Sequence, residues 1–147
     1  MISPKSVSKL IRVVIDTNCL RASIPPKSPF YDLYRYFEAG LFTWYVSTEI
    51  LLEYEEILGL TYSEHTAHLV LHVLAIAPNT VFAEPAFRWE LIPNDLDDNK
   101  FADLAISVNA DYLVTNDTDY AIFNEIDFPS LRVIGLEDFL KELRDRL

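Results

Sequence analysis

Four acidic residues are spaced along the chain where their carboxylates could act together. Asp16 follows a β-branched run from Ile11 to Ile15, and Asp117 comes shortly after a similar run from Tyr112 to Thr115. Because such a run predicts a buried strand, both acids are expected at the carboxyl ends of strands. Either acid on its own could equally make a turn or cap a helix.

Glu53 lies on the inward face of a predicted helix. It comes three residues after Ile50 and four before Ile57, so it shares their apolar stripe. A carboxylate on a core-facing stripe is unfavourable unless a partner compensates it. The alternative to a functional role for Glu53 is a buried salt bridge.

Asp98 shares a predicted helical face with three apolar residues, Phe101, Ala102 and Ala105. Lys100 and Asp103 are expected to point away from that face. The alternative for Asp98 is a structural one, in which its side chain caps the backbone amides of its own helix.

Together the four acids predict a site for a hard divalent cation. Carboxylates gathered at one edge of a sheet repel one another unless they share a cation or keep their protons. Ligand sets made only of oxygen favour Mg²⁺ or Mn²⁺ over zinc. The main use of such a cluster is to hold metal against a phosphodiester and activate water for its hydrolysis. The expected catalytic and metal-binding residues are Asp16, Glu53, Asp98 and Asp117.

The elements that must position these acids alternate along the chain. Strands are expected at residues 11–15, 41–46, 81–83, 112–115 and 131–134. Helices are expected at residues 31–39, 47–58 (with Gly59 as the stop), 63–77, 97–109 and 136–147. This order predicts an α/β fold, a three-layer α/β/α sandwich around a mainly parallel sheet, in one domain over residues 1–147. In such sheets, ligands bind at the carboxyl ends of the strands.

Composition excludes several classes of protein. The 147 residues include 12 basic and 23 acidic side chains, a formal net charge of -11, which argues against wrapping nucleic acid with a broad basic face. The single cysteine, Cys19, excludes an internal disulfide and is expected to be a small buried residue. Apolar runs are too short to span a membrane, and the cytoplasm is the expected compartment.

The four acids and their surroundings resemble a PIN domain of the prokaryotic branch that contains VapC-related toxins of toxin–antitoxin pairs. The matching stretches begin with Val14-Ile15-Asp16-Thr17-Asn18, continue with the helix that carries Glu53, and then include residues 97–105 and 109–119. The resemblance extends from about Arg12 to the C-terminal helix.

The resemblance implies an endoribonuclease that uses Mg²⁺ or Mn²⁺ and leaves a 5′-phosphate and a 3′-hydroxyl. Asn18, Thr115 and Asp119 match auxiliary polar positions of that family. An RNA substrate, a cognate antitoxin and a homodimer are the partners it implies. Asn116 stands where the family often has glycine, and asparagine tolerates a left-handed turn there.

Three other functions compete with this interpretation. A haloacid-dehalogenase-like enzyme would need an acid two residues after Asp16, where this chain has Asn18. A receiver domain would need a late lysine beside its acids, and none is evident. The remaining alternative is a PIN-fold module that binds RNA or protein without catalysis, and the presence of all four acids argues against it.

Several further residues carry expectations of their own. His65, His68 and His72 share a helix face that is expected to be a polar surface rather than a transition-metal site. Tyr34 and Phe37 are expected in the core, which leaves Tyr31 and Tyr36 as candidates for an interface. Residues 22–31 match no motif. The basic residues nearest in sequence to the expected site are Arg21, Lys27 and Lys100.

Overall fold

A parallel sheet forms the centre of the fold. Its order is β3-β2-β1-β4-β5, and all four pairs of neighbouring strands are parallel. The strands are short and rich in β-branched and aromatic residues, which favour a pleated, buried surface. They are β1 (Ile11–Ile15), β2 (Phe42–Val46), β3 (Thr80–Phe82), β4 (Tyr112–Val114) and β5 (Val133–Ile134).

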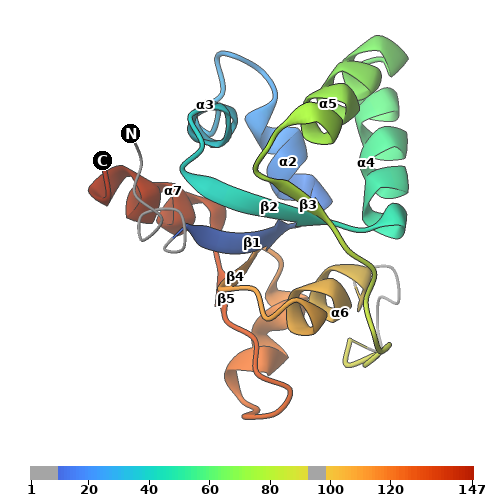
Figure 1. The fold of residues 1–147 in the computed structure, drawn as a ribbon, viewed down its shortest axis with the longest axis vertical. Helices are drawn as coiled ribbons and strands as arrows, with labels where there is room; N and C mark the ends of the chain where they lie inside the picture. Colours follow the sequence, from blue (N-terminus) through green and yellow to red (C-terminus); the bar gives the residue numbers. More distant parts are fainter. Residues whose placement is uncertain (1–9, 93–98) are drawn as a thin grey trace.

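Helices cover both faces of this sheet. The structure, a computed structural model, describes residues 10–92 and 99–147. Helices α2 to α5 lie on one side of β1 and β2, and α6 lies on the other, which confirms the expected three-layer arrangement (Figure 1). The helices are α2 (Thr17–Ser23), α3 (Asp32–Glu38), α4 (Thr48–Thr61), α5 (Glu64–Ile76), α6 (Asn99–Ser107), α7 (Leu136–Asp145) and the 3₁₀ helix η2 (Thr118–Asn124).

The order in which strands are added to the sheet reverses at β1. From β1 the sheet grows through β2 to β3 on one side, and β4 then returns to the opposite side of β1. Ile15 is in register with Val114, so the residues that come after these two strands emerge beside each other. A ligand site in an open parallel sheet is expected at such a switch point.

Aromatic side chains join the sheet to α3 and α7. The Phe37 ring meets the Trp44 ring at 5.1 Å between centroids, and the Phe42 ring meets the Phe139 ring at 5.3 Å, both nearly edge to face. All four side chains are buried. Since edge-to-face pairs add to the stabilisation from burial, this cluster ties the helices firmly to the middle of the sheet.

Helix α4 continues past the glycine that was predicted to end it. Ser47 caps its first turn as expected, accepting a hydrogen bond from the Ile50 N–H at 3.3 Å. Gly59 lies inside the helix, which ends after Thr61, where the Tyr62 N–H donates to the Leu58 carbonyl at 2.9 Å. Glycine is unfavourable within a helix by only about 1 kcal/mol, and burial of Leu58 outweighs that penalty.

Two short helices were not predicted from the sequence. Helix α2 begins directly after Asp16, and η2 begins directly after Asp117. Each spans seven residues, too few for a hydrophobic period to be visible. The strands that lead into the two acids are in place, so the missing helices do not change the predicted positions of Asp16 and Asp117 at strand ends.

On α3 the two tyrosines are both half-buried, rather than divided between the core and an interface. Phe37 is buried as predicted, but Tyr34 is only half-buried, and its ring lies 5.6 Å from that of Tyr31. Tyr36, a candidate for an interface, is half-buried and packs in part against the core. The reason is that α3 buries Leu33 and Phe37, four residues apart, which turns Tyr34 toward the surface.

Arg12 fastens the C-terminal end of α6 to the sheet. Its guanidinium donates to the carbonyls of Val108 and Asn109 at 2.6 and 3.2 Å and to the Tyr45 hydroxyl at 2.8 Å. Its backbone N–H donates to an Asp111 carboxylate oxygen at 2.8 Å. A cation at a helix C-terminus satisfies carbonyls that have no partner within the helix.

No helix in the described part of the chain is long and apolar enough to cross a membrane.

Replacing Arg12 with methionine keeps the apolar stem and removes these donors. We expect Arg12→Met to lower the free energy of unfolding by about 1–3 kcal/mol, the usual range for hydrogen bonds to a charged group. Urea unfolding measures the difference. The matched control is Arg35→Met, because the Arg35 side chain is 68% exposed and pairs only with Asp32 on its own helix among the contacts described. Equal losses in the two variants would contradict the role of Arg12.

Candidate active site

Asp16 is a buried carboxylate at the end of β1. It is 6% exposed. One oxygen, Oδ1, accepts the backbone N–H of Cys19 at 2.9 Å and thereby caps α2. The other oxygen, Oδ2, accepts a short hydrogen bond from the Thr115 hydroxyl. Asp16 therefore caps a helix, which was one of its two interpretations, and also faces the neighbouring strand end.

Thr115 connects Asp16 to Asp117. Its hydroxyl donates to Asp16 and accepts the backbone N–H of Asp117 at 3.0 Å. Across the sheet, the Asp16 N–H donates to the Val114 carbonyl at 3.0 Å, which keeps the two chain segments in contact beyond the strands. Asp16 and Asp117 are thus brought to one place by the pairing of β1 with β4.

Burial makes the ionised form of Asp16 unfavourable. Its pKa is raised above the ordinary value, first because the carboxylate is removed from water and in a smaller part because Asp117 places a second negative charge nearby. The hydrogen bonds from Thr115 and Cys19 oppose the increase in pKa without cancelling it. A carboxyl group in this state would be stabilised in its charged form by a nearby cation.

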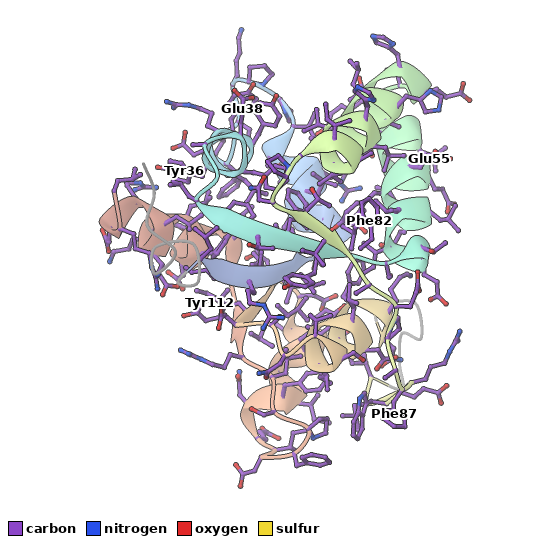
Figure 2. All side chains as sticks on the ribbon, in the orientation of Figure 1. Tyr36, Glu38, Glu55, Phe82, Phe87 and Tyr112 are labelled. Carbon is purple, nitrogen blue, oxygen red and sulfur yellow. The ribbon has the colours of Figure 1, made fainter. Side chains whose placement is uncertain are left out.

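Glu53 is held by two partners. The Thr17 hydroxyl donates to Oε2. The Lys100 ammonium lies 2.8 Å from Oε1, and the Lys100 and Glu53 side chains are only 12% and 23% exposed. The buried salt bridge left open by the sequence is therefore present, and it connects α4 to α6. On the same helix, Glu55 points outward (Figure 2), as expected for a solvated charge.

Asp98 lies outside the described residues. The helix it was predicted to open, α6, is described from Asn99 onward, and the expected inward face is confirmed, because Phe101, Ala102 and Ala105 are buried.

Lys100 and Asp103 do not point into solvent from α6. Lys100 pairs with Glu53, and Asp103 is 4% exposed and accepts the Trp89 N–H at 3.0 Å. Burial raises the pKa of Asp103 above its ordinary value. The physical reason is that residues 86–92 cover a second face of α6, and helical periodicity within α6 carries no signal of that cover.

The auxiliary residues are divided by the structure. Thr115 is buried at the centre of the site, between Asp16 and Asp117. Asn18 is exposed, and its Oδ1 accepts a hydrogen bond from Arg21 on the same helix at 2.8 Å. Asp119 is also exposed; its backbone N–H donates to Asp117 Oδ1 at 2.9 Å, so that Asp117 caps η2.

Asn116 has a structural role different from the expected one. In the described segments, the positive φ angles outside glycine occur at Glu90 and Asn109, so Asn116 does not use the left-handed conformation. Its Oδ1 accepts the Leu136 N–H at 3.0 Å, at the start of α7. A Cβ on Gly135 would come within 3.1 Å of that oxygen, so glycine permits this close approach.

Two positioning residues were missed in the sequence. Tyr54 is fully buried, and its hydroxyl donates to the Ile15 carbonyl, next to Asp16, while accepting the Trp44 indole N–H at 3.3 Å. Thr17 orients Glu53. A tyrosine on an apolar stripe signals that its hydroxyl needs a buried partner, although not which one.

Within residues 10–92 and 99–147, no three histidine, cysteine, aspartate or glutamate side chains gather closely enough to hold a metal ion.

His65, His68 and His72 are exposed on α5, which confirms that they form a polar surface. Cys19 is buried, and burial raises the pKa of its thiol far above the ordinary value, which confirms a small inert core residue.

Removing the charge of Asp16 should stabilise the protein. A folded-state pKa above the unfolded one means that ionisation disfavours folding, so the penalty is absent at low pH and grows as pH rises. We expect Asp16→Asn to raise the free energy of unfolding at about pH 7 by on the order of 1 kcal/mol. The difference in stability between the variant and the parent should become smaller toward about pH 4. Asparagine can keep the helix cap.

Urea unfolding across this pH range checks the expectation, with Asp119→Asn as the control because Asp119 is exposed. A variant Asp16→Asn that is less stable than the parent at neutral pH would show that the buried charge is compensated within the protein.

Comparisons with known proteins agree with this fold. The sequence matches the family model of the PIN domain over residues 12–119. One similar solved structure is VapBC2 from Rickettsia felis bound to a DNA fragment from their promoter, at 20% identity and a TM-score of 0.57, covering 84% of this chain and 97% of that one.

Two further structures share the fold. VapC20 from Mycobacterium tuberculosis, a sarcin-ricin loop cleaving toxin, is 11% identical with a TM-score of 0.57, over 75% of this chain and 93% of its own. FitAcB from Neisseria gonorrhoeae is 15% identical with a TM-score of 0.56, over 85% and 98%. No curated protein matches the sequence. With a matching family model over most of its length and the same fold, this chain belongs to the PIN-domain family.

Proposed function

We propose that this protein is a metal-dependent endoribonuclease that hydrolyses RNA phosphodiester bonds. The observation that carries the proposal is the buried Asp16 carboxylate, whose pKa is raised and which shares Thr115 with Asp117 at the switch point of the sheet. A carboxylate kept in an unfavourable environment beside a second acid is a feature of functional sites more than of structural ones. Membership of the PIN-domain family adds support.

The donor set fits a hard cation. Asp16 and Asp117 offer carboxylate oxygens from adjacent strand ends, Glu53 offers another from α4, and Asp98 belongs to the same proposed quartet by sequence. Oxygen ligands of this kind suit Mg²⁺ or Mn²⁺. Such a cation, when bound, activates water and offsets negative charge on the phosphate.

The chain's own residues orient these donors. Thr115 fixes one oxygen of Asp16, and Thr17 fixes one oxygen of Glu53. Lys100 places a positive charge 2.8 Å from Glu53, at the edge where a phosphate would approach. These contacts fix the orientation of Asp16 and Glu53 before substrate binds, and preorganisation of this kind is the condition for electrostatic catalysis.

The proposal predicts RNA cleavage that requires Mg²⁺ or Mn²⁺ and stops when EDTA is added. Asp16→Asn and Asp98→Asn should each reduce the rate at least about 100-fold, because each removes a charge at the reacting phosphate. Glu55→Gln, a change of the same kind on the exposed side of α4, should leave the rate unchanged. Cleavage of a labelled RNA pool measures all three.

Robust cleavage by Asp16→Asn protein would refute the metal-site assignment. Failure of the pure protein to cut any RNA in the pool would favour the alternative, a PIN-fold module that binds without catalysis.

We further propose that the protein is the toxin of a type II pair and that an antitoxin protein restrains it. VapC20 is a toxin by its description, and the net charge of -11 suits a basic protein partner. An apolar groove of about 210 Å³ between α2, α3 and α5 offers a docking surface for that partner. Its lining includes Leu20, Tyr31, Tyr34, Leu69 and Val73.

Expression of the protein should arrest growth, and co-expression of the product of an adjacent small gene should relieve the arrest. Leu69→Glu places a charge in the groove, at a side chain that is 53% exposed, and should keep toxicity while losing relief. Leu52→Glu, at a 62% exposed position that does not line the groove, is the control and should keep both. Relief that survives Leu69→Glu would remove the groove from the interface.

A further inference from the structure

Three aromatic rings form a continuous strip on the surface beside α6. The Phe87 ring lies 6.1 Å from the Trp89 ring at an interplanar angle of 62°, and the Trp89 ring lies 5.6 Å from the Phe128 ring at 82°. The first two come from the segment after β3, and the third comes from the segment between η2 and β5. Two stretches far apart in the sequence therefore supply one surface.

The outer two rings are open to solvent. Phe87 is 69% exposed and Phe128 is 78% exposed, while Trp89 between them is half-buried. Phe87, on the segment between β3 and α6, lies away from the sheet (Figure 2). Neighbouring exposed aromatic side chains are unfavourable in water, so a patch of this kind indicates a binding surface.

Hydrogen bonds to α6 hold the segment that carries Phe87 and Trp89. The Trp89 N–H donates to Asp103 at 3.0 Å, and the Ala86 N–H donates to the Ser107 hydroxyl at 2.9 Å. Ile92 exchanges two hydrogen bonds with the Asn99 side chain, both at 3.0 Å. The backbone that presents Phe87 and Trp89 is thus fixed before a ligand binds, which lowers the entropy cost of binding.

The strip is also adjacent to the candidate active site. Asp103, which holds Trp89, is one helical turn from Lys100, the partner of Glu53. Arg88, between Phe87 and Trp89 in sequence, places its guanidinium 3.2 Å from Glu49, one turn before Glu53 on α4. The Trp89 end of the strip is therefore linked through α6 and Arg88 to the edge of the site that carries Glu53 and Lys100.

The charge of the protein favours nucleobases as the occupant. An acidic protein gains little affinity from phosphate neutralisation, whereas stacking of bases on aromatic rings needs no positive charge. The Arg88 side chain, 74% exposed, adds a planar guanidinium, which also stacks on bases. A protein partner has a separate and more enclosed apolar surface in the groove between α2, α3 and α5.

We propose that Phe87, Trp89 and Phe128 form a platform on which unpaired bases of the RNA substrate stack, next to the phosphodiester bond that the acids address. This inference rests on the proposed ribonuclease activity and names the part of the substrate that is recognised. The substrate is therefore single-stranded at the position that lies on the platform.

Tryptophan fluorescence tests the platform without catalysis. The chain has two tryptophans, and Trp44 is 3% exposed in the aromatic core, so quenching by RNA reports on Trp89. Titration of Asp16→Asn protein with a short single-stranded RNA of mixed sequence should quench the fluorescence, and wild-type protein in EDTA should give the same curve. Trp89→Phe in the same background should abolish the quenching.

Phe87→Ala and Phe128→Ala should each weaken RNA binding about 10-fold, as expected for loss of one stacked base. Both side chains are mostly exposed, so neither change should affect folding. Phe82→Ala, which removes a 56% exposed ring on β3, is the matched control and should bind RNA normally. Duplex RNA of the same sequence should quench less than the single strand.

The outcomes separate this inference from the proposed function. If wild-type protein cleaves RNA while Phe87→Ala and Phe128→Ala bind it with unchanged affinity, the platform is refuted and the ribonuclease stands. If those two variants bind RNA normally but lose the antitoxin, the strip is a protein surface, which also refutes the inference. If wild-type protein cleaves no RNA although the single strand quenches Trp89, the proposed function fails while the platform is retained.

Discussion

The hydrogen bond from Thr115 to Asp16 is the constraint on which the candidate site depends. It exists because β1 and β4 pair in parallel with Ile15 opposite Val114, so that the next residues of the two strands emerge together. Since side chains alternate along a strand, a shift of one residue in this pairing would turn Thr115 to the other face of the sheet. The same hydroxyl accepts the Asp117 N–H, so both strand-end acids take their positions from one register.

How much of this could be predicted from the sequence differs from residue to residue. The places of Asp16 and Asp117 follow from β-branched runs that end at the same edge of a sheet, and Glu53 follows from helical periodicity. The position of Lys100 does not follow from the sequence. Helical periodicity reveals one buried face of a helix, whereas α6 is covered on a second face by residues 86–92. Helices α2 and η2 are too short to show a period, although the acids that cap them are visible in the sequence.

Because the chain is acidic, the basic side chains near the site already form ion pairs with its carboxylates. Lys100 pairs with Glu53, and Arg88 pairs with Glu49, one turn earlier on α4. Paired cations contribute less to the attraction of phosphate than free ones, so the proposed ribonuclease would have to gain its RNA affinity chiefly from bound metal and from apolar contacts. In an acidic protein, an exposed aromatic strip beside the acids therefore points to base stacking as a source of RNA affinity. Stacking does not depend on the sign of the protein's charge.

The capping and catalytic interpretations of the two strand-end acids are compatible. Asp16 uses Oδ1 to cap α2, and Asp117 uses Oδ1 to cap η2. A carboxylate has two oxygens, so each cap leaves the second oxygen available for another partner, and the cap also limits the directions in which that oxygen can point. At Asp16 the second oxygen meets Thr115. Helix capping would thus supply the preorganisation that the proposed metal ligands need, and an acid that only caps a helix would not need to be buried beside another acid.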